Sequence, residues 1–206
     1  MIVKNIIEDI MPDVWPMVLI ITVIVSSLRI AYLLNNNKKF CLHKEVLSLI
    51  FIIYILCLYH VVTFQDINYG TNNFIPFKEI FRYPVGSAKF IKNIIGNIAL
   101  FIPFGFFSSY YLNHKKLATP AILTLVTSLT IEIVQYYIGR VFDIDDILLN
   151  VLGGVLGFLL FVGFAAIKER LPKIMKSDAF LNFLIIVIIV LMIVYSFNLN
   201  IFGWFG

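Results

Sequence analysis

Six apolar runs, each about as long as a bilayer is thick, constrain the fold of this chain more than any other feature. A helix needs about 20 residues to cross a hydrocarbon core of about 30 Å. Such runs occur at 14–34, 46–64, 92–112, 119–138, 146–167 and 180–201. Because 61% of the residues are hydrophobic and only 14% are charged, the composition excludes a soluble domain. The sequence predicts an all-α membrane protein, a polytopic bundle of about six transmembrane helices forming a single integral membrane domain over residues 1–206.

Basic residues in three of the connecting loops predict the orientation. These residues are Lys38, Lys39, Lys44, Lys115, Lys116, Lys168, Arg170, Lys173 and Lys176. The positive-inside rule places their loops in the cytoplasm, so both termini and the loops at 65–91 and 139–145 are predicted to be extracytoplasmic at the cell membrane. Lys78, Arg82, Lys89 and Lys92 in the outer loop oppose this assignment. The acidic first 13 residues do not resemble a cleavable signal peptide, so we expect them to be retained.

The net charge and the cysteines point to lipids rather than to other partners. The formal net charge of +4 is explained by cytoplasmic lysines beside anionic lipid head groups, so no nucleic-acid partner is expected. Cys41 lies in a predicted loop and Cys57 in a predicted helix, which makes a disulfide between them implausible. No histidine has a second histidine at ligand spacing, and we expect no metal and no cofactor.

A line of polar residues between 132 and 157 is the strongest clue to function. At about 100° per helical residue, Glu132 and Gln135 share one face, and Asp143, Asp146 and Asn150 share another. Asp145 is expected to point to solvent. Ionisable groups inside a membrane are costly unless they are paired or face a wet cavity. We therefore predict a ligand-binding cavity open to the outer face, lined by Asn93, Asn97, Glu132, Gln135, Arg140, Asp143, Asp146 and Asn150.

Each of these residues also has a structural explanation. Asp143 and Asp146 have the spacing of a helix-capping pair, and Arg140 is near enough in sequence to pair with Asp143. The amides can serve as hydrogen-bonded contacts between helices, and Gly153 with Gly157 suits close helix packing. A hard-cation site built from Glu132, Asp143 and Asp146 is a further alternative.

The long connection at 65–91 mixes aromatic and charged residues, as a segment in the membrane interface does. Connections of this length without structure of their own are uncommon. Two roles remain open for it, an anchored surface loop and a lid over the cavity. Asn73, Pro76 and Phe77 are its candidate lid residues.

Together these residues resemble the VanZ-like family of bacterial membrane proteins. The matching positions are Asn73, Pro76, Phe77, Asn97, Phe101, Pro103, Gly105, Glu132, Gln135, Gly139, Arg140, Asp143, Asp146, Asn150 and Gly153. The resemblance covers a core of about residues 46–165, with the first and last helices outside it. It implies a role in the cell envelope, because the family takes its name from a determinant of resistance to teicoplanin and related lipoglycopeptides. It does not imply a particular reaction.

Three functions follow from this pattern. The first is recognition of an amphiphile at the outer leaflet, either a lipid-linked wall precursor or the lipid tail of a lipoglycopeptide, with Arg140 contacting an anionic group. The second is an enzyme, a membrane-embedded hydrolase or transferase acting on a lipid head group or a polyprenyl-linked substrate. A small transporter is the third, although only Pro103 hints at the broken helices that transporters use.

Overall fold

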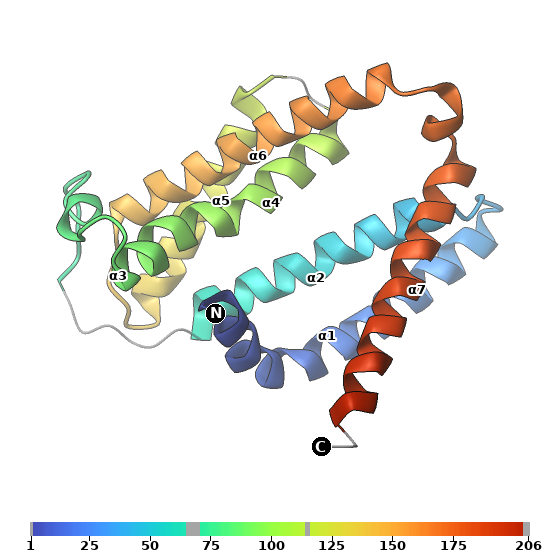
Figure 1. The fold of residues 1–206 in the computed structure, drawn as a ribbon. Coiled ribbons are helices and arrows are strands. Elements are labelled where there is room, and N and C mark those ends of the chain that lie inside the picture. Colours follow the sequence, from blue (N-terminus) through green and yellow to red (C-terminus); the bar gives the residue numbers. More distant parts are fainter. Residues whose placement is uncertain (1, 65–70, 114–115, 204–206) are drawn as a thin grey trace. The chain divides into compact units, whose positions relative to one another are not determined.

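The structure is a computed structural model that describes residues 2–64, 71–113 and 116–203 (Figure 1). Its long helices are α1 (Ile2–Asn35), α2 (Leu42–Phe64), α4 (Gly96–Leu112), α5 (Ala118–Tyr137), α6 (Ile144–Arg170) and α7 (Asp178–Gly203). Shorter turns are η1 (Ile80–Arg82), α3 (Ala88–Phe90), the π-helical turn η2 (Ile91–Ile95) and η3 (Lys173–Lys176). The described residues form no strand, only an isolated bridge between Asn73 and Asp143.

The helix lengths confirm the predicted fold class. Among the described residues, five segments are long and apolar enough to cross a membrane, namely Val14–Asn35, Leu42–Thr63, Ala88–Leu112, Ala118–Tyr137 and Ile144–Arg170. The part of α7 at Asp178–Ile193 is also apolar but shorter. The chain is therefore an all-α, multi-pass membrane protein.

The chain divides into two compact units, and the divisions fall inside α1, inside α2 and near the end of α6. One unit contains Met1–Val14 with Tyr54–Ile167, and the other contains Trp15–Ile53 with Lys168–Gly206. In the second unit, the Arg29 guanidinium donates to both carboxylate oxygens of Glu45 at 2.7 and 3.0 Å, which joins α1 to the start of α2. The prediction of one membrane domain over the whole chain stays a prediction.

Helix α6 is the central helix of the first unit. In its most apolar part 44% of the residues are buried within the protein, against 6% in α2. Helices α4, α5 and α6 run side by side (Figure 1). Large apolar side chains are exposed on their outer faces, for example Leu125, Leu148 and Leu159, as expected for helices that face lipid.

Glycines let these three helices approach to backbone contact. A Cβ atom added at Gly105 would lie 2.0 Å from the carbonyl oxygen of Gly154, and one at Gly154 would lie 2.2 Å from the Thr124 hydroxyl oxygen. At Gly153 the nearest atom would be the Ile98 carbonyl oxygen, at 2.2 Å. Since no side chain fits at these positions, the glycines are a packing seam, which confirms the packing role predicted for Gly153.

Candidate functional site

A polar pocket lies inside the first unit, between the end of α2, α4, α5 and the start of α6. Its volume is about 40 Å³. The polar residues that line it are Asn97, Glu132, Gln135, Arg140, Asp146 and Asn150, and the apolar ones are Val61, Val62, Leu100, Phe101 and Ile131. The structure thus places six of the eight residues expected at the cavity around one pocket. Asn93 and Asp143 are not among the lining residues.

Glu132 occupies the wall of this pocket from α5. Its side chain is only 2% exposed, and its Oε2 atom accepts a hydrogen bond from the backbone N–H of Asp143 at 2.8 Å. Asp143 is the residue just before α6, at the end of the helix where backbone N–H groups have no partner within the helix. A carboxylate is favoured there because the helix dipole is positive at that end. Glu132 therefore helps to hold the start of α6 against the end of α5.

Asp146 and Asn97 connect α6 to α4 across the pocket. The Asn97 side-chain N–H donates to Asp146 Oδ1 at 2.5 Å. Asn97 lies just after the π-helical turn η2, which covers Ile91–Ile95. Such turns are frequent at functional sites because they change the direction in which the following side chains point. The contact leaves Asp146 only partly buried at the edge of the pocket.

Asn150 lines the pocket and carries a buried oxygen that makes no hydrogen bond to the described residues. Its side-chain N–H donates to the Ser128 hydroxyl at 2.9 Å. Its Oδ1 atom is buried and has no hydrogen-bond partner in the part of the chain that the structure describes. A buried acceptor without a donor costs about 1–3 kcal/mol. The pocket therefore favours an occupant that donates a hydrogen bond to Asn150.

Arg140 and Gln135 both bind the end of α2. The Arg140 guanidinium donates to the Val62 carbonyl oxygen at 2.6 Å, and the Gln135 amide donates to the same oxygen at 3.2 Å. Gly139, with a φ of +86°, lies between α5 and Arg140. Since the last carbonyls of a helix lack partners within it, both contacts stabilise the C-terminal turn of α2. The alternative of an Arg140–Asp143 ion pair is not found among the described residues.

Comparison with known proteins identifies the family that this architecture represents. The family model described as VanZ/LLP1 matches residues 47–168, more than half of the 206 residues. The chain belongs to the VanZ/LLP1 family. It is also similar to Protein VanZ of Enterococcus faecium, with 27% identity over 158 residues, covering 76% of this chain and 90% of that protein. No solved structure matches the chain. The family resemblance expected from the motif residues is thereby confirmed.

In this VanZ/LLP1 protein, Asp143 caps α6 and does not line the pocket. Its Oδ1 atom accepts hydrogen bonds from the Asp145 backbone N–H at 2.9 Å and from the Asn73 side chain at 2.8 Å. Burial raises the pKa of Asp143, and these two hydrogen bonds lower it. Asp146 does not return a bond to the Asp143 N–H, because Glu132 already accepts from it. Asp143 therefore caps α6, as the capping alternative has it, and its assignment to the cavity stays a prediction.

Asp145 lies elsewhere than the helical spacing predicts. The spacing points it to solvent, but the residue is only 1% exposed. Its carboxylate accepts backbone hydrogen bonds from Phe77 at 2.5 Å, Glu79 at 2.7 Å and Ile80 at 3.3 Å. Nearly every residue has a backbone N–H, so the sequence does not show which of these groups bind Asp145. Asp145 anchors the incoming loop to the start of α6.

The loop expected to form a lid is tied to this helix start. The Asn73 N–H donates to the Phe142 carbonyl at 2.8 Å, and the Asn73 carbonyl accepts from the Ile144 N–H at 3.1 Å. Pro76 and Phe77 are exposed, and Asn73, Pro76 and Phe77 do not line the pocket. Residues 65–70 of this connection lie outside the described residues. The lid role stays a prediction.

Helix α5 also carries a buried polar stripe, of which the sequence pattern predicted only the part that contains Glu132 and Gln135. Thr124 and Ser128 are fully buried and lie two turns and one turn before Glu132 on the same face. Ser128 binds Asn150, and Thr124 contacts the glycine seam at the position of Gly154. The spacing of four residues was a signal that could have found both hydroxyls.

Hydrogen-bonding and charged groups make up the polar part of the pocket wall. Two carboxyl groups, one guanidinium and three amides line it, and neither a histidine nor a cysteine is among the lining residues. The hard-cation alternative gains no support. Among the described residues, the carboxylate oxygens of Glu132, Asp143 and Asp146 do not come together within 4.8 Å of one another as a set of metal ligands would. The arrangement suits binding of a small polar group that both accepts and donates hydrogen bonds.

Proposed function

We propose that this VanZ/LLP1 protein binds the polar end of an amphiphile at the outer leaflet of the cell membrane. A lipid-linked wall precursor and a lipoglycopeptide such as teicoplanin are the candidate ligands, and the consequence would be lower susceptibility to glycopeptide antibiotics. The observation that carries the proposal is that Asn150, whose buried Oδ1 has no hydrogen-bond partner among the described residues, lines the same pocket as Glu132, Asp146 and Arg140.

The size of the pocket limits what it can hold. A volume of about 40 Å³ corresponds to roughly three water-sized positions, because one water needs about 10–15 Å³ on this measure. That is room for a carboxylate, a phosphate oxygen pair or a hydroxyl group, and not for a whole sugar. We propose that the protein recognises one terminal group of a larger molecule, whose apolar part remains in the lipid.

The charges of the lining residues suggest the chemistry of that group. Arg140 can bind an anionic oxygen through its remaining N–H donors, while Glu132 and Asp146 can accept from hydroxyl or ammonium groups. Asn150 adds an acceptor that has no competing partner. A ligand with both a donor and an anionic oxygen fits this set better than a purely anionic one.

Replacement of Asn150 by leucine tests the proposal directly. Asn150→Leu removes an unsatisfied acceptor and keeps the number and branching of the side-chain heavy atoms, so the loss of the polar group offsets the cost of the larger methyl groups and the free energy of unfolding should change little. Ser128, which loses its partner, can donate to the carbonyl one turn back. We expect the strain producing this variant to become as susceptible to lipoglycopeptides as a strain without the protein, at an unchanged level of protein in the membrane.

Two companion variants and one control complete this experiment. Glu132→Gln keeps an acceptor for the Asp143 N–H and removes the charge, and Arg140→Ala removes the guanidinium; both should abolish protection. Thr130→Leu is the control, because Thr130 is exposed on α5 and, within the described residues, its hydroxyl bonds to the Val126 carbonyl of its own helix. If Asn150→Leu and Glu132→Gln retain full protection, the polar cluster is structural and the proposal fails.

An enzyme remains the second candidate, because two carboxyl groups line one pocket together with a guanidinium. That is the set a general acid and base would need, with Arg140 stabilising developing charge. Lipids extracted from the purified protein and from membranes with and without it distinguish the candidates by mass spectrometry. Unchanged bound lipid supports recognition, whereas a new lipid product that disappears in Glu132→Gln supports the hydrolase or transferase.

A further inference from the structure

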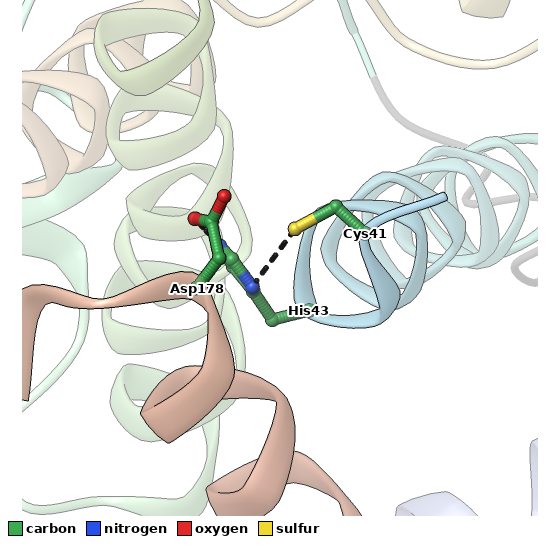
Figure 2. A group of neighbouring side chains, drawn as sticks. All are labelled: Cys41, His43 and Asp178. Carbon is green, nitrogen blue, oxygen red and sulfur yellow. Dashed lines mark hydrogen bonds and ion pairs between the residues drawn. The ribbon is translucent and has the colours of Figure 1, made fainter. Parts of the chain in front are cut away.

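A second cluster of reactive side chains lies outside the segment matched by the family model. Cys41 and His43 are at the start of α2, and Asp178 begins α7 (Figure 2). One donor atom from each lies within 4.8 Å of the other two. All three residues belong to the same compact unit. We propose that this cluster is a zinc site that joins the start of α2 to the start of α7.

Two short sequence spacings present the donors. Cys41 and His43 are two positions apart at the entry to α2, and the Cys41 sulfur lies 3.3 Å from His43 Nδ1. Asp178 and Asn182 are four positions apart on α7, so they lie on the same face of that helix. The pairing of these two faces gives a thiol, an imidazole and a carboxylate in one place. These are the three ligand types that bind Zn²⁺.

Hydrogen bonds to Asn182 orient the imidazole. Asn182 Oδ1 accepts from the His43 backbone N–H at 2.9 Å and lies 2.9 Å from His43 Nδ1. An oxygen that already accepts from a backbone N–H is an acceptor, so Nδ1 carries the hydrogen that donates to it. In the neutral ring the lone pair is then on Nε2. A metal-binding histidine is typically held in this way, by an acceptor at its other nitrogen.

The free nitrogen faces a carboxylate at a distance that suits a shared cation. His43 Nε2 is 3.7 Å from Asp178 Oδ1, too far for a hydrogen bond. Two atoms bound to the same zinc ion at about 2.0–2.2 Å lie roughly 3.3–3.8 Å apart. One donor atom of each of the three residues already lies within 4.8 Å of the other two, so the sulfur needs to approach by at most roughly 1.2 Å to reach zinc-binding separations. Asp178 is mostly exposed and therefore has room to adjust.

The chemistry of the donors selects the metal. A thiolate and an imidazole favour zinc over magnesium or calcium, which prefer oxygen ligands. Three protein ligands leave the fourth tetrahedral position to water. The orientation predicted from the basic loops places the cluster in the cytoplasm, where thiols stay reduced.

One neighbouring residue competes with the metal. The Lys44 ammonium lies 3.3 Å from Asp178 Oδ1 and 3.4 Å from Oδ2. Both side chains are more than half exposed, so water weakens their attraction and a divalent ion can displace the lysine. Without a metal, the cluster would be an ion pair and hydrogen-bond network alone. Removal of Lys44 distinguishes the two cases. It should strengthen binding if the cluster holds a metal, and it should weaken the network if the cluster holds none.

Cobalt spectroscopy on the full chain tests the proposal. The protein is purified in detergent with a histidine-free tag and a metal-free reductant, and Co²⁺ is added in steps. We expect about one bound ion per chain, with a thiolate-to-cobalt charge-transfer band that added Zn²⁺ abolishes. Cys41→Ser should remove the band, and Asp178→Asn should weaken binding by about tenfold or more. Lys44→Gln should bind as tightly as the unaltered protein or more tightly.

The second cysteine supplies the matched control. Cys57 lies inside α2, away from His43 and Asp178 in sequence, so Cys57→Ser should keep the band and the stoichiometry. Absence of a thiolate band in the unaltered protein, or an equal band in Cys41→Ser, overturns the proposal and leaves the network alone. Since the polar pocket is not involved, its variants should bind cobalt normally whichever function the pocket has.

Discussion

At the scale of single residues, the acids around the start of α6 have different tasks although they are close in sequence. Glu132 accepts from the N–H of the residue just before α6, Asp143 accepts from an N–H in its first turn, and Asp146 binds Asn97 at the pocket. Asp145 holds the backbone of the loop that arrives from α2. A carboxylate with several backbone donors around it is stable when buried, because charged hydrogen bonds are stronger than neutral ones.

The first prediction concerns Asp145. Asp145→Ala should lower the free energy of unfolding by about 2–3 kcal/mol, because it leaves the backbone N–H groups of Phe77 and Glu79 without an acceptor. Unfolding of the purified protein in mixed detergent micelles measures the change. Glu79→Gln, in the same loop, is the control. It breaks only the exposed contact with Arg82 and should change stability by less than about 1 kcal/mol.

A loss of stability in Glu79→Gln as large as that in Asp145→Ala would contradict this account.

The acids of this region also differ in how well the sequence predicted their positions. Helical spacing places Glu132 and Gln135 on one face, as the structure has them. The same reasoning failed for Asp145, because at the first turn of a helix the neighbouring chain arrives from the side and is not described by helical periodicity.

At the scale of elements, the apolar runs predicted the helices well but not the turns between them. The run at 92–112 corresponds to α4 preceded by the π-helical turn η2. Hydrophobicity does not distinguish a π turn from an α turn, so the local shift before Asn97 could not be foreseen. The glycine seam was more predictable. Small residues four positions apart in an apolar helix are typical of close packing between membrane helices.

The second prediction compares two glycines of α6. Gly153→Leu should prevent α4 from reaching α6, because even a Cβ atom there would lie 2.2 Å from the Ile98 carbonyl oxygen. We expect a loss of about 3 kcal/mol or more, seen as poor accumulation in the membrane and a lower melting temperature. Gly163→Leu is the matched control, since a Cβ atom there meets nothing within 4 Å. Equal accumulation of the two variants would refute the packing role of Gly153.

At the scale of the whole molecule, the contacts that could not be predicted join residues that are distant in sequence. The contact of His43 with Asn182 and that of Asn73 with Asp143 have no local signature. The segment matched by the family model includes every pocket residue, whereas the Cys41 cluster depends on helix starts outside it. The prediction that both termini are extracytoplasmic rests on the distribution of basic residues alone.

The last prediction tests that orientation by cysteine labelling in intact cells. Cys41 and Cys57 are first replaced by serine, and single cysteines are then introduced at Asn36 and at Val85. Val85 is 88% exposed and belongs to the loop that we predict to be extracytoplasmic, whereas the nearby Asn72 accepts a hydrogen bond from Phe142 and is less suitable. An impermeant reagent should label position 85 in intact cells and position 36 only after the membrane is opened, because Lys38 and Lys39 keep their loop in the cytoplasm. Labelling of position 36 in intact cells would show that the topology is the reverse of the predicted one. It would then place the pocket at the inner leaflet, out of reach of an antibiotic that acts from outside.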